Sequence, residues 1–245
     1  MHRTPLIAAN WKMNGSAALV EETMFALAAV PTTAVDILVC PPATLLSRFG
    51  QHTHFALGAQ TLSHEISGAF TGELSAALLI EAGARYVIVG HSERRQFHQE
   101  GDGLVARKAK ACLQANITPI ICVGETESEY DDGKTLTVVR RQLQAVLDLL
   151  QGQIEACIIA YEPVWAIGTG KVPTPAQAQD VHRELRLQLA KFDDTAASKV
   201  AILYGGSLKP DNAKDLLAMP DIDGGLVGGA SLNAKDFLAL CQACK

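Results

Sequence analysis

Residues 118–162, TPIICVGETESEYDDGKTLTVVRRQLQAVLDLLQGQIEACIIAYE, contain the pattern that decides the fold. The apolar run at 118–125 predicts a β-strand, the helical spacing at 135–150 predicts a helix, and the apolar run at 157–162 predicts a second strand. Strands that are apolar along their whole length, with helices between them, indicate a parallel sheet covered by those helices.

The same alternation extends over the rest of the chain. Six further apolar runs are predicted as strands: 5–10, 35–41, 54–60, 86–91, 200–206 and 224–230. A second helical pattern, 174–192, begins with Thr174 as its capping residue and Pro175 at its first helical position. Eight strands in 245 residues, with no Pro/Ser-rich boundary, favour one α/β domain over residues 1–245. A closed (β/α)8 barrel fits this count better than an open, doubly wound sheet.

Composition narrows the class of protein. Hydrophobic residues make up 48% of the chain and charged residues 19%, so one large core could bury roughly 70–75% of the unfolded surface. The net charge of -5 argues against nucleic-acid or anionic-membrane binding, because both need clustered Lys and Arg. The first residues lack a signal-peptide pattern, and no apolar stretch reaches the roughly 18 residues of a membrane span. We therefore expect a soluble, cytoplasmic protein.

The six cysteines show neither the paired spacing of a zinc site nor the density of a disulfide scaffold. The closest pair, Cys241 and Cys244, ends the last helical pattern. We expect ordinary thiols.

In such a barrel the active site lies at the carboxyl ends of the strands. The residues predicted there are Asn10 and Lys12, His91 with Ser92 and Glu93, Glu162, Gly205 with Gly206 and Ser207, and Gly228 with Gly229. Each has an ordinary alternative, such as a turn cap, a solvated charge, a structural histidine, an ion-pair partner or a plain strand-to-helix turn. Their convergence on one face favours a site.

The glycine turns after the last two strands suit a phosphate group. Backbone N–H groups at Gly228 and Gly229, opening a short helix, could point at a phosphate because no Cβ blocks its approach. Ser207 could add a hydroxyl. Such dipoles, together with Lys12, would let an acidic protein hold a dianion.

Six motifs in this order resemble those of the triosephosphate isomerase family: AANWKMNG (8–15), SGAFTGE (67–73), VGHSERR (89–95), AYEPVWAIGTGK (160–171), YGGS (204–207) and LVGGASL (226–232). The resemblance implies a TIM barrel that interconverts dihydroxyacetone phosphate and D-glyceraldehyde 3-phosphate through an enediolate. This isomerase reaction belongs to glycolysis and gluconeogenesis. The resemblance implies no cofactor and no metal.

The resemblance also assigns the residues. Glu162 would be the base and His91 a neutral imidazole donor, which is the established assignment for this enzyme rather than one deduced from spacing. Lys12 would stabilise negative charge developing on the substrate oxygen and attract the phosphate, and Asn10 would help to orient both of these substrate groups. Gly168, Ser207, Gly228 and Gly229 would bind phosphate. Glu93 would contact Lys12, and Ser92 would hold Glu162 when the lid is open.

Residues 163–173 are predicted to be that lid, and its closure is expected to remove water from Glu162. Where this chain has Pro173, the family commonly has a residue whose N–H bonds the hydroxyl of the Tyr in YGGS, here Tyr204. Proline has no N–H, so we expect that latch to be weak.

The polar stretch 64–75 is long for a loop in a compact barrel. By resemblance it would reach into a second subunit and place Thr71 near that subunit's Asn10 and Lys12, making a homodimer. The alternative is a loose surface loop.

Two other functions compete. Another phosphate-binding barrel enzyme, such as an aldolase or a different sugar-phosphate isomerase, would need a Schiff-base lysine or a metal cluster, and the sequence suggests neither. A silent barrel acting as a binding protein should have lost Lys12, His91 or Glu162, and all three are present.

Overall fold

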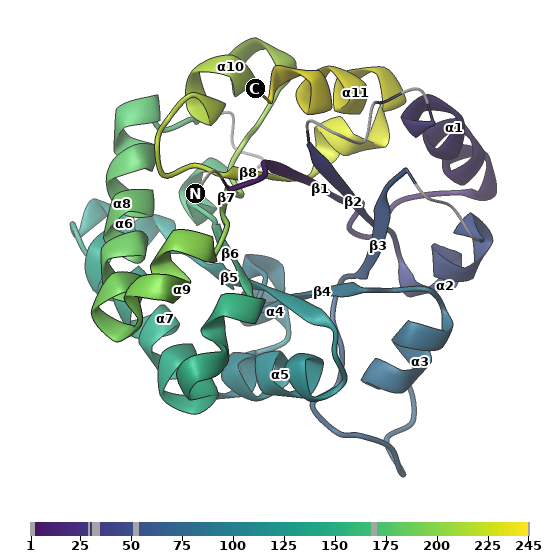
Figure 1. The fold of residues 1–245 in the computed structure, drawn as a ribbon, viewed down its shortest axis with the longest axis horizontal. Helices are drawn as coiled ribbons and strands as arrows, with labels where there is room; N and C mark the ends of the chain where they lie inside the picture. Colours follow the sequence, from purple (N-terminus) through teal and green to yellow (C-terminus); the bar gives the residue numbers. More distant parts are fainter. Residues whose placement is uncertain (1–2, 29, 31–34, 51–53, 168–170, 245) are drawn as a thin grey trace.

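The computed structural model describes residues 3–28, 30, 35–50, 54–167 and 171–244. Eight parallel strands close into a barrel because β1 pairs with both β2 and β8 (Figure 1). The strands are β1 (Leu6–Asn10), β2 (Asp36–Cys40), β3 (Ala56–Ala59), β4 (Tyr86–Val89), β5 (Thr118–Val123), β6 (Ile158–Tyr161), β7 (Ile202–Tyr204) and β8 (Gly224–Val227). The prediction of a closed (β/α)8 barrel is confirmed.

Helices form an outer ring around the strands (Figure 1). They are α1 (Ala17–Leu27), α2 (Ala43–Leu46), α3 (Ala76–Glu81), α4 (Ser92–Phe97), α5 (Asp102–Gln114), α6 (Glu127–Asp131), α7 (Thr135–Leu150), α8 (Pro175–Phe192), α9 (Asp194–Lys199), α10 (Pro210–Leu217) and α11 (Ala234–Ala243). Short 3-10 turns are η1 (Ser47–Phe49), η2 (Gln151–Ala156), η3 (Val164–Ala166) and η4 (Gly229–Leu232). No described helix is long and apolar enough to cross a membrane.

The start of α8 shows how sequence sets an element boundary. Thr174 accepts a hydrogen bond from the Gln177 N–H, and the Gln177 side chain accepts one from the Thr174 N–H. This reciprocal capping satisfies two N–H groups that the helix itself leaves free, and Pro175 needs no such partner. The predicted start and end of this helix are therefore both confirmed.

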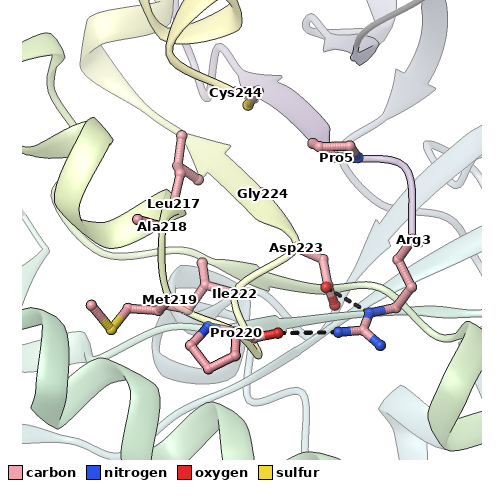
Figure 2. Close-up of a pocket in the computed structure, with 10 residues that line it drawn as sticks. All are labelled: Arg3, Pro5, Leu217, Ala218, Met219, Pro220, Ile222, Asp223, Gly224 and Cys244. Carbon is pink, nitrogen blue, oxygen red and sulfur yellow. Dashed lines mark hydrogen bonds and ion pairs between the residues drawn. The ribbon is translucent and has the colours of Figure 1, made fainter. Parts of the chain in front are cut away.

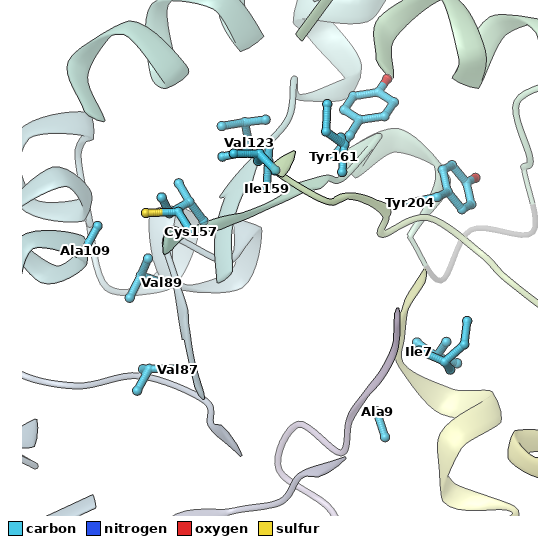
Figure 3. Packing of buried hydrophobic residues seen from close by; sticks show 14 of the residues in the cluster. Ile7, Ala9, Val87, Val89, Ala109, Val123, Cys157, Ile159, Tyr161 and Tyr204 are labelled. Atoms are coloured by element: carbon cyan, nitrogen blue, oxygen red, sulfur yellow. The ribbon is translucent and has the colours of Figure 1, made fainter. Parts of the chain in front are cut away.

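Alternation along the strands separates two layers of core. In β1, Leu6 and Ala8 belong to the cluster inside the barrel, whereas Ile7 and Ala9 belong to the cluster between strands and helices. Figure 3 shows members of this outer cluster, with Tyr161 and Tyr204 among them. Because the period is two, Asn10 follows Leu6 and Ala8 on the inner face, at the barrel mouth.

Several predicted strands run too far at their carboxyl ends. The runs predicted to end at residues 91, 125 and 206 leave the sheet at Val89, Val123 and Tyr204. A glycine follows each of these strands, and Gly90 adopts a left-handed φ of 70°, which turns the chain out of the ladder. The residues beyond these glycines therefore form the mouth of the barrel rather than its wall.

Candidate active site

A cavity of about 300 Å³ opens at the carboxyl ends of the strands. Its lining includes Asn10, Lys12, His91, Glu162, Ser207, Gly228 and Gly229. These residues come from the ends of β1, β4, β6, β7 and β8, which lie far apart in the sequence. The structure thus brings together seven of the residues predicted for the site.

Another hollow, of about 390 Å³, lies at the amino ends of β1 and β8 (Figure 2). The Arg3 Nε atom lies 2.6 Å from Asp223 Oδ1 there, and an Arg3 Nη atom donates to the Pro220 carbonyl. These contacts tie the start of the chain to the segment before β8. This end of such a barrel contributes stability rather than chemistry.

Glu162 is held by the beginning of α4. It continues the inward register of Ile158 and Ala160, and its side chain is only 2% exposed. Its Oε2 accepts a 2.9 Å hydrogen bond from the Ser92 N–H, and its Oε1 lies 2.9 Å from His91 Nε2. The Ser92 hydroxyl is 3.5 Å from Oε1. A carboxylate suits this place because the first N–H groups of a helix have no partner within the helix.

The surroundings of His91 indicate which of its nitrogens carries the proton. His91 caps α4, and its Nδ1 accepts a 3.2 Å hydrogen bond from the Glu93 N–H. An Nδ1 that accepts cannot carry a proton, so the proton of a neutral ring sits on Nε2 and faces Glu162. The ring is therefore a neutral donor aimed into the cavity.

The two groups shift each other's pKa. Burial raises the pKa of Glu162, but the His91 ring and the Ser92 N–H outweigh it, so the pKa is lowered. Burial lowers the pKa of His91, and the Glu162 carboxylate outweighs this and raises it. The Glu162 carboxylate is the main cause that raises the His91 pKa, and Glu93 raises it by a smaller amount. Once Glu162 moves away, burial and the bond at Nδ1 both favour the neutral ring.

The backbone at Lys12 is left-handed, with φ of 54°. This costs a residue with a side chain about 1–2 kcal/mol. Two contacts hold it: the Lys12 N–H donates to Asn10 Oδ1 at 3.0 Å, and the Lys12 carbonyl accepts from Gln60 Nε2 at 2.8 Å. The turn aims Nζ across the mouth, where it lies 2.5 Å from Glu93 Oε1.

Glycine is required at the end of β7. A Cβ at Gly205 would lie 2.9 Å from Glu162 Cγ and 3.1 Å from the Tyr161 carbonyl oxygen. One at Gly206 would overlap the Tyr204 hydroxyl. Any larger residue at these positions would displace Glu162 or the tyrosine. After β8, Gly228 precedes η4, the short helix predicted there, which is of the 3-10 type.

Two predictions concern the lid. Gly168 lies outside the described residues, so its part in phosphate binding stays a prediction. The side chain of Glu162 is 2% exposed, and the loss of water expected on lid closure stays a prediction as well. What a closing lid would change is its partners, because Ser92 and His91 now occupy both carboxylate oxygens.

Tyr204 is fully buried, and its hydroxyl has no hydrogen-bond partner among the described residues. Pro173 is buried as well.

Sequence reasoning missed three residues around the site. Gln60 ends the third predicted strand and donates a hydrogen bond to the Lys12 carbonyl.

Glu125 is the second of these residues, and it is fully buried. It accepts hydrogen bonds from Trp165 Nε1 at 2.8 Å and from the Tyr161 hydroxyl at 3.1 Å. Burial raises the pKa of Glu125. It anchors the first turn of the lid. Lys209 lines the cavity beyond Ser207. All three stand at or just beyond a predicted strand end, which was the available signal.

Comparisons with known proteins show the family of this chain. The family model described as Triosephosphate isomerase matches residues 5–244. A protein named triosephosphate isomerase from Polynucleobacter asymbioticus is 51% identical, over 98% of this chain and 100% of its own. One from Alkalilimnicola ehrlichii is 50% identical over 99% of both chains. One from Nitrosococcus oceani is 51% identical over 98% of this chain and 99% of its own. The chain belongs to the triosephosphate isomerase family.

Proposed function

We propose that this cavity interconverts dihydroxyacetone phosphate and D-glyceraldehyde 3-phosphate, with Glu162 as the base that moves the proton. The chain is an isomerase of triose phosphates, the enzyme class of its family and of glycolysis. The observation that carries the residue assignment is the 2.9 Å approach of the Glu162 carboxylate to His91 Nε2 inside a cavity that Lys12 also lines. A base, a neutral donor and a cation thus meet around a space large enough for a three-carbon phosphate.

In this proposal Glu162 takes a proton from the carbon beside the substrate carbonyl. The C–H electron pair forms the double bond of an enediolate, and the carbonyl π electrons move onto oxygen. Glu162 then returns the proton to the neighbouring carbon. The hydroxyl proton on the first carbon's oxygen passes through His91 to the oxygen of the former carbonyl, which completes the shift from ketose to aldose. Leaving Ser92 and His91 frees its oxygens for this step, because the bonds that lower its pKa are lost.

His91 serves the substrate oxygens. With the ring neutral, the Nε2–H donates to the carbonyl oxygen and stabilises the charge that develops there. The Glu93 N–H on Nδ1 keeps the proton at Nε2. A charged ring would carry a second proton on Nδ1, and Nδ1 could then no longer accept the hydrogen bond from the Glu93 N–H.

Lys12 and Asn10 supply charge and orientation. The left-handed turn, fixed by Asn10 and Gln60, holds the Lys12 ammonium where negative charge collects on the substrate. Glu93, 2.5 Å from Nζ, keeps this cation in place before substrate binds. The phosphate group is placed on Ser207, Gly228 and Gly229, with Gly168 expected to join them.

We further propose that the working unit is a homodimer formed through residues 64–75. The side chains of Ile66 and Phe70 in this segment are 82% and 46% exposed, and Met13, beside Lys12, is 96% exposed. Large apolar side chains exposed together are typical of protein interfaces. Thr71 would then approach the partner's site. We place the enzyme in the cytoplasm, consistent with its role in glycolysis.

A coupled assay tests the isomerase activity. Formation of D-glyceraldehyde 3-phosphate from dihydroxyacetone phosphate is followed through a dehydrogenase that consumes the product. We expect rapid turnover by the native chain and loss of at least about 1000-fold in kcat for Glu162→Gln, which removes the base and keeps the shape. An inactive native chain, or an active Gln variant, would overturn the proposal.

A further inference from the structure

Lys209 is a cation of the cavity lining that the proposed mechanism does not use. It lies two residues beyond Ser207, directly before α10, and its side chain is exposed. No ion pair joins Lys209 to any described residue, whereas the cavity's other lysine is paired with a carboxylate. Its charge therefore faces the solvent at the mouth through which substrate must enter.

The charge balance of the cavity makes a second cation useful. The Lys12 charge is largely offset by Glu93 at 2.5 Å, and Glu162 adds a further negative charge to the lining. The whole chain carries a net charge of -5. A triose phosphate is a dianion at neutral pH, so it approaches a molecule that on average repels it.

Asn212 fixes the backbone that carries Lys209. Its Oδ1 accepts a 2.8 Å hydrogen bond from the Lys209 N–H, and its Nδ2 donates to the Ser207 carbonyl at 2.9 Å. One amide thus ties Lys209 to the residue whose hydroxyl is assigned to phosphate. The backbone of Lys209 therefore keeps a fixed place beside the phosphate site.

We infer that Lys209 is a second phosphate-attracting cation, which raises the capture of the dianionic substrate without touching the reacting carbons. This inference rests on the proposed function for the identity of the substrate. It assigns Lys209 to substrate capture and affinity, through charge acting across solvent.

The test compares Lys209→Gln, Lys209→Glu and Lys209→Arg with Lys214→Gln and Lys214→Glu. Lys214 is exposed on α10, the helix that Lys209 precedes, but it lies outside the cavity lining, so its variants change the net charge equally. For each protein, kcat and KM are measured at about 10 mM and about 150 mM salt, where the Debye lengths are about 30 Å and about 8 Å. Binding of inorganic phosphate is measured by NMR titration, independently of turnover.

At low salt, Lys209→Gln should raise KM and weaken phosphate binding by about two- to fivefold, and Lys209→Glu should do so more strongly. The loss should shrink at the higher salt concentration, kcat should change less than KM, and Lys209→Arg should restore native values. The Lys214 variants should follow the native protein.

The inference is overturned if Lys209→Glu behaves like Lys214→Glu, if its loss is the same at both salt concentrations, or if Lys209→Arg fails to restore affinity. A native chain without turnover, whose phosphate binding is weakened in Lys209→Gln, would overturn the isomerase assignment and support the capture role of Lys209.

Discussion

Glu162 and His91 show how a buried pair is kept ready for proton transfer. The Ser92 N–H and the His91 ring hold the carboxylate ionised at 2% exposure, which burial alone would disfavour. The same contacts make the carboxylate a weaker base than a free one. When Glu162 moves from these donors to the substrate, the hydrogen bonds that lower its pKa are lost, and the carboxylate becomes a stronger base.

Glu162→Asp retains the charge and withdraws the carboxylate by about one methylene. Misplacement of about 1 Å can cost on the order of 100-fold, so kcat should fall by at least that factor. Steady-state kinetics give kcat, and inorganic phosphate inhibition reports the intact phosphate site, which should change less than about twofold. A kcat near the native value would remove Glu162 from the role of base.

His182 predicts a pH dependence of stability. The side chain is fully buried on α8, its Nδ1 lies 3.2 Å from the Asp221 carbonyl oxygen, and its Nε2 has no partner among the described residues. Burial lowers the pKa of His182 from 6.5 to about 4. Between these values the unfolded chain binds more protons than the folded one. Stability is therefore full above pH 6.5 and is lost as the pH falls toward 4.

We expect His182 to remove about 3 kcal/mol of unfolding free energy between pH 7 and pH 4. His182→Asn keeps a donor for the Asp221 carbonyl but cannot titrate, so this part of the pH dependence should vanish. Urea denaturation across the pH range measures the effect. His98→Asn, at an exposed histidine, serves as the control. Equal pH dependence in native protein and His182→Asn would contradict the assignment.

Among the elements, the strands and helices of the barrel could be predicted from the sequence because each has its own local pattern of apolar and polar residues. Residues 135–150 were predicted as a helix and form α7 with the same bounds. The strand ends were less predictable, because apolar character continues past the glycine that ends the ladder, as at Gly90. Gln60 and Glu125 were missed for another reason: their hydrogen bonds join distant segments, and nothing local in the sequence marks the partner.

The candidate site was predictable in composition but not in its contacts. Strand-end position identified Asn10, Lys12 and Glu162, since residues at period two share the inner face. Which oxygen of Glu162 meets Ser92, and which nitrogen of His91 accepts a hydrogen bond, depends on how α4 begins. Such detail needs coordinates, because a shift of one turn in α4 would leave the sequence pattern unchanged.

The lid predicted from the sequence is the element where we expect this chain to depart from the pattern that the resemblance implies. Pro173 has no N–H to offer the Tyr204 hydroxyl, and that hydroxyl has no partner among the described residues. A neutral hydrogen bond contributes about 0.5–1.5 kcal/mol, and the stiffer proline offsets part of its loss by reducing the chain entropy that closure removes. We expect the Tyr204 hydroxyl to contribute little to closure.

Tyr204→Phe should therefore lower kcat/KM by less than about threefold in the native background. In Pro173→Ala, which restores the donor, the same change should cost more, with a coupling above about 0.5 kcal/mol. The double-mutant cycle in kcat/KM measures this coupling. A tenfold loss in Tyr204→Phe alone, or simple additivity of the two changes, would show that the latch does not depend on residue 173.

For the whole molecule, the question is whether a single barrel is stable and active without a second subunit. A hollow of about 400 Å³ in the segment after β3 is lined by Ile66, Phe70 and Leu78, all of them exposed. Phe97, the last residue of α4, is 69% exposed. A monomer would leave these apolar side chains in water. Burying them in an interface would contribute a free energy of about 25 cal/mol for each Å² of apolar surface.

Phe70→Asp places a charge where the proposed dimer would exclude water, so association should weaken by several kcal/mol. Sedimentation equilibrium should give the native chain twice the mass of its 26.1 kDa subunit and the variant the mass of one. Activity per chain should fall with the dimer, because Thr71 would no longer reach the partner's site. Phe25→Asp is the matched control, since Phe25 is 85% exposed on α1, outside residues 64–75. A native chain that sediments as a fully active monomer, or a Phe70→Asp variant that stays dimeric, would show that the segment 64–75 does not form the subunit interface.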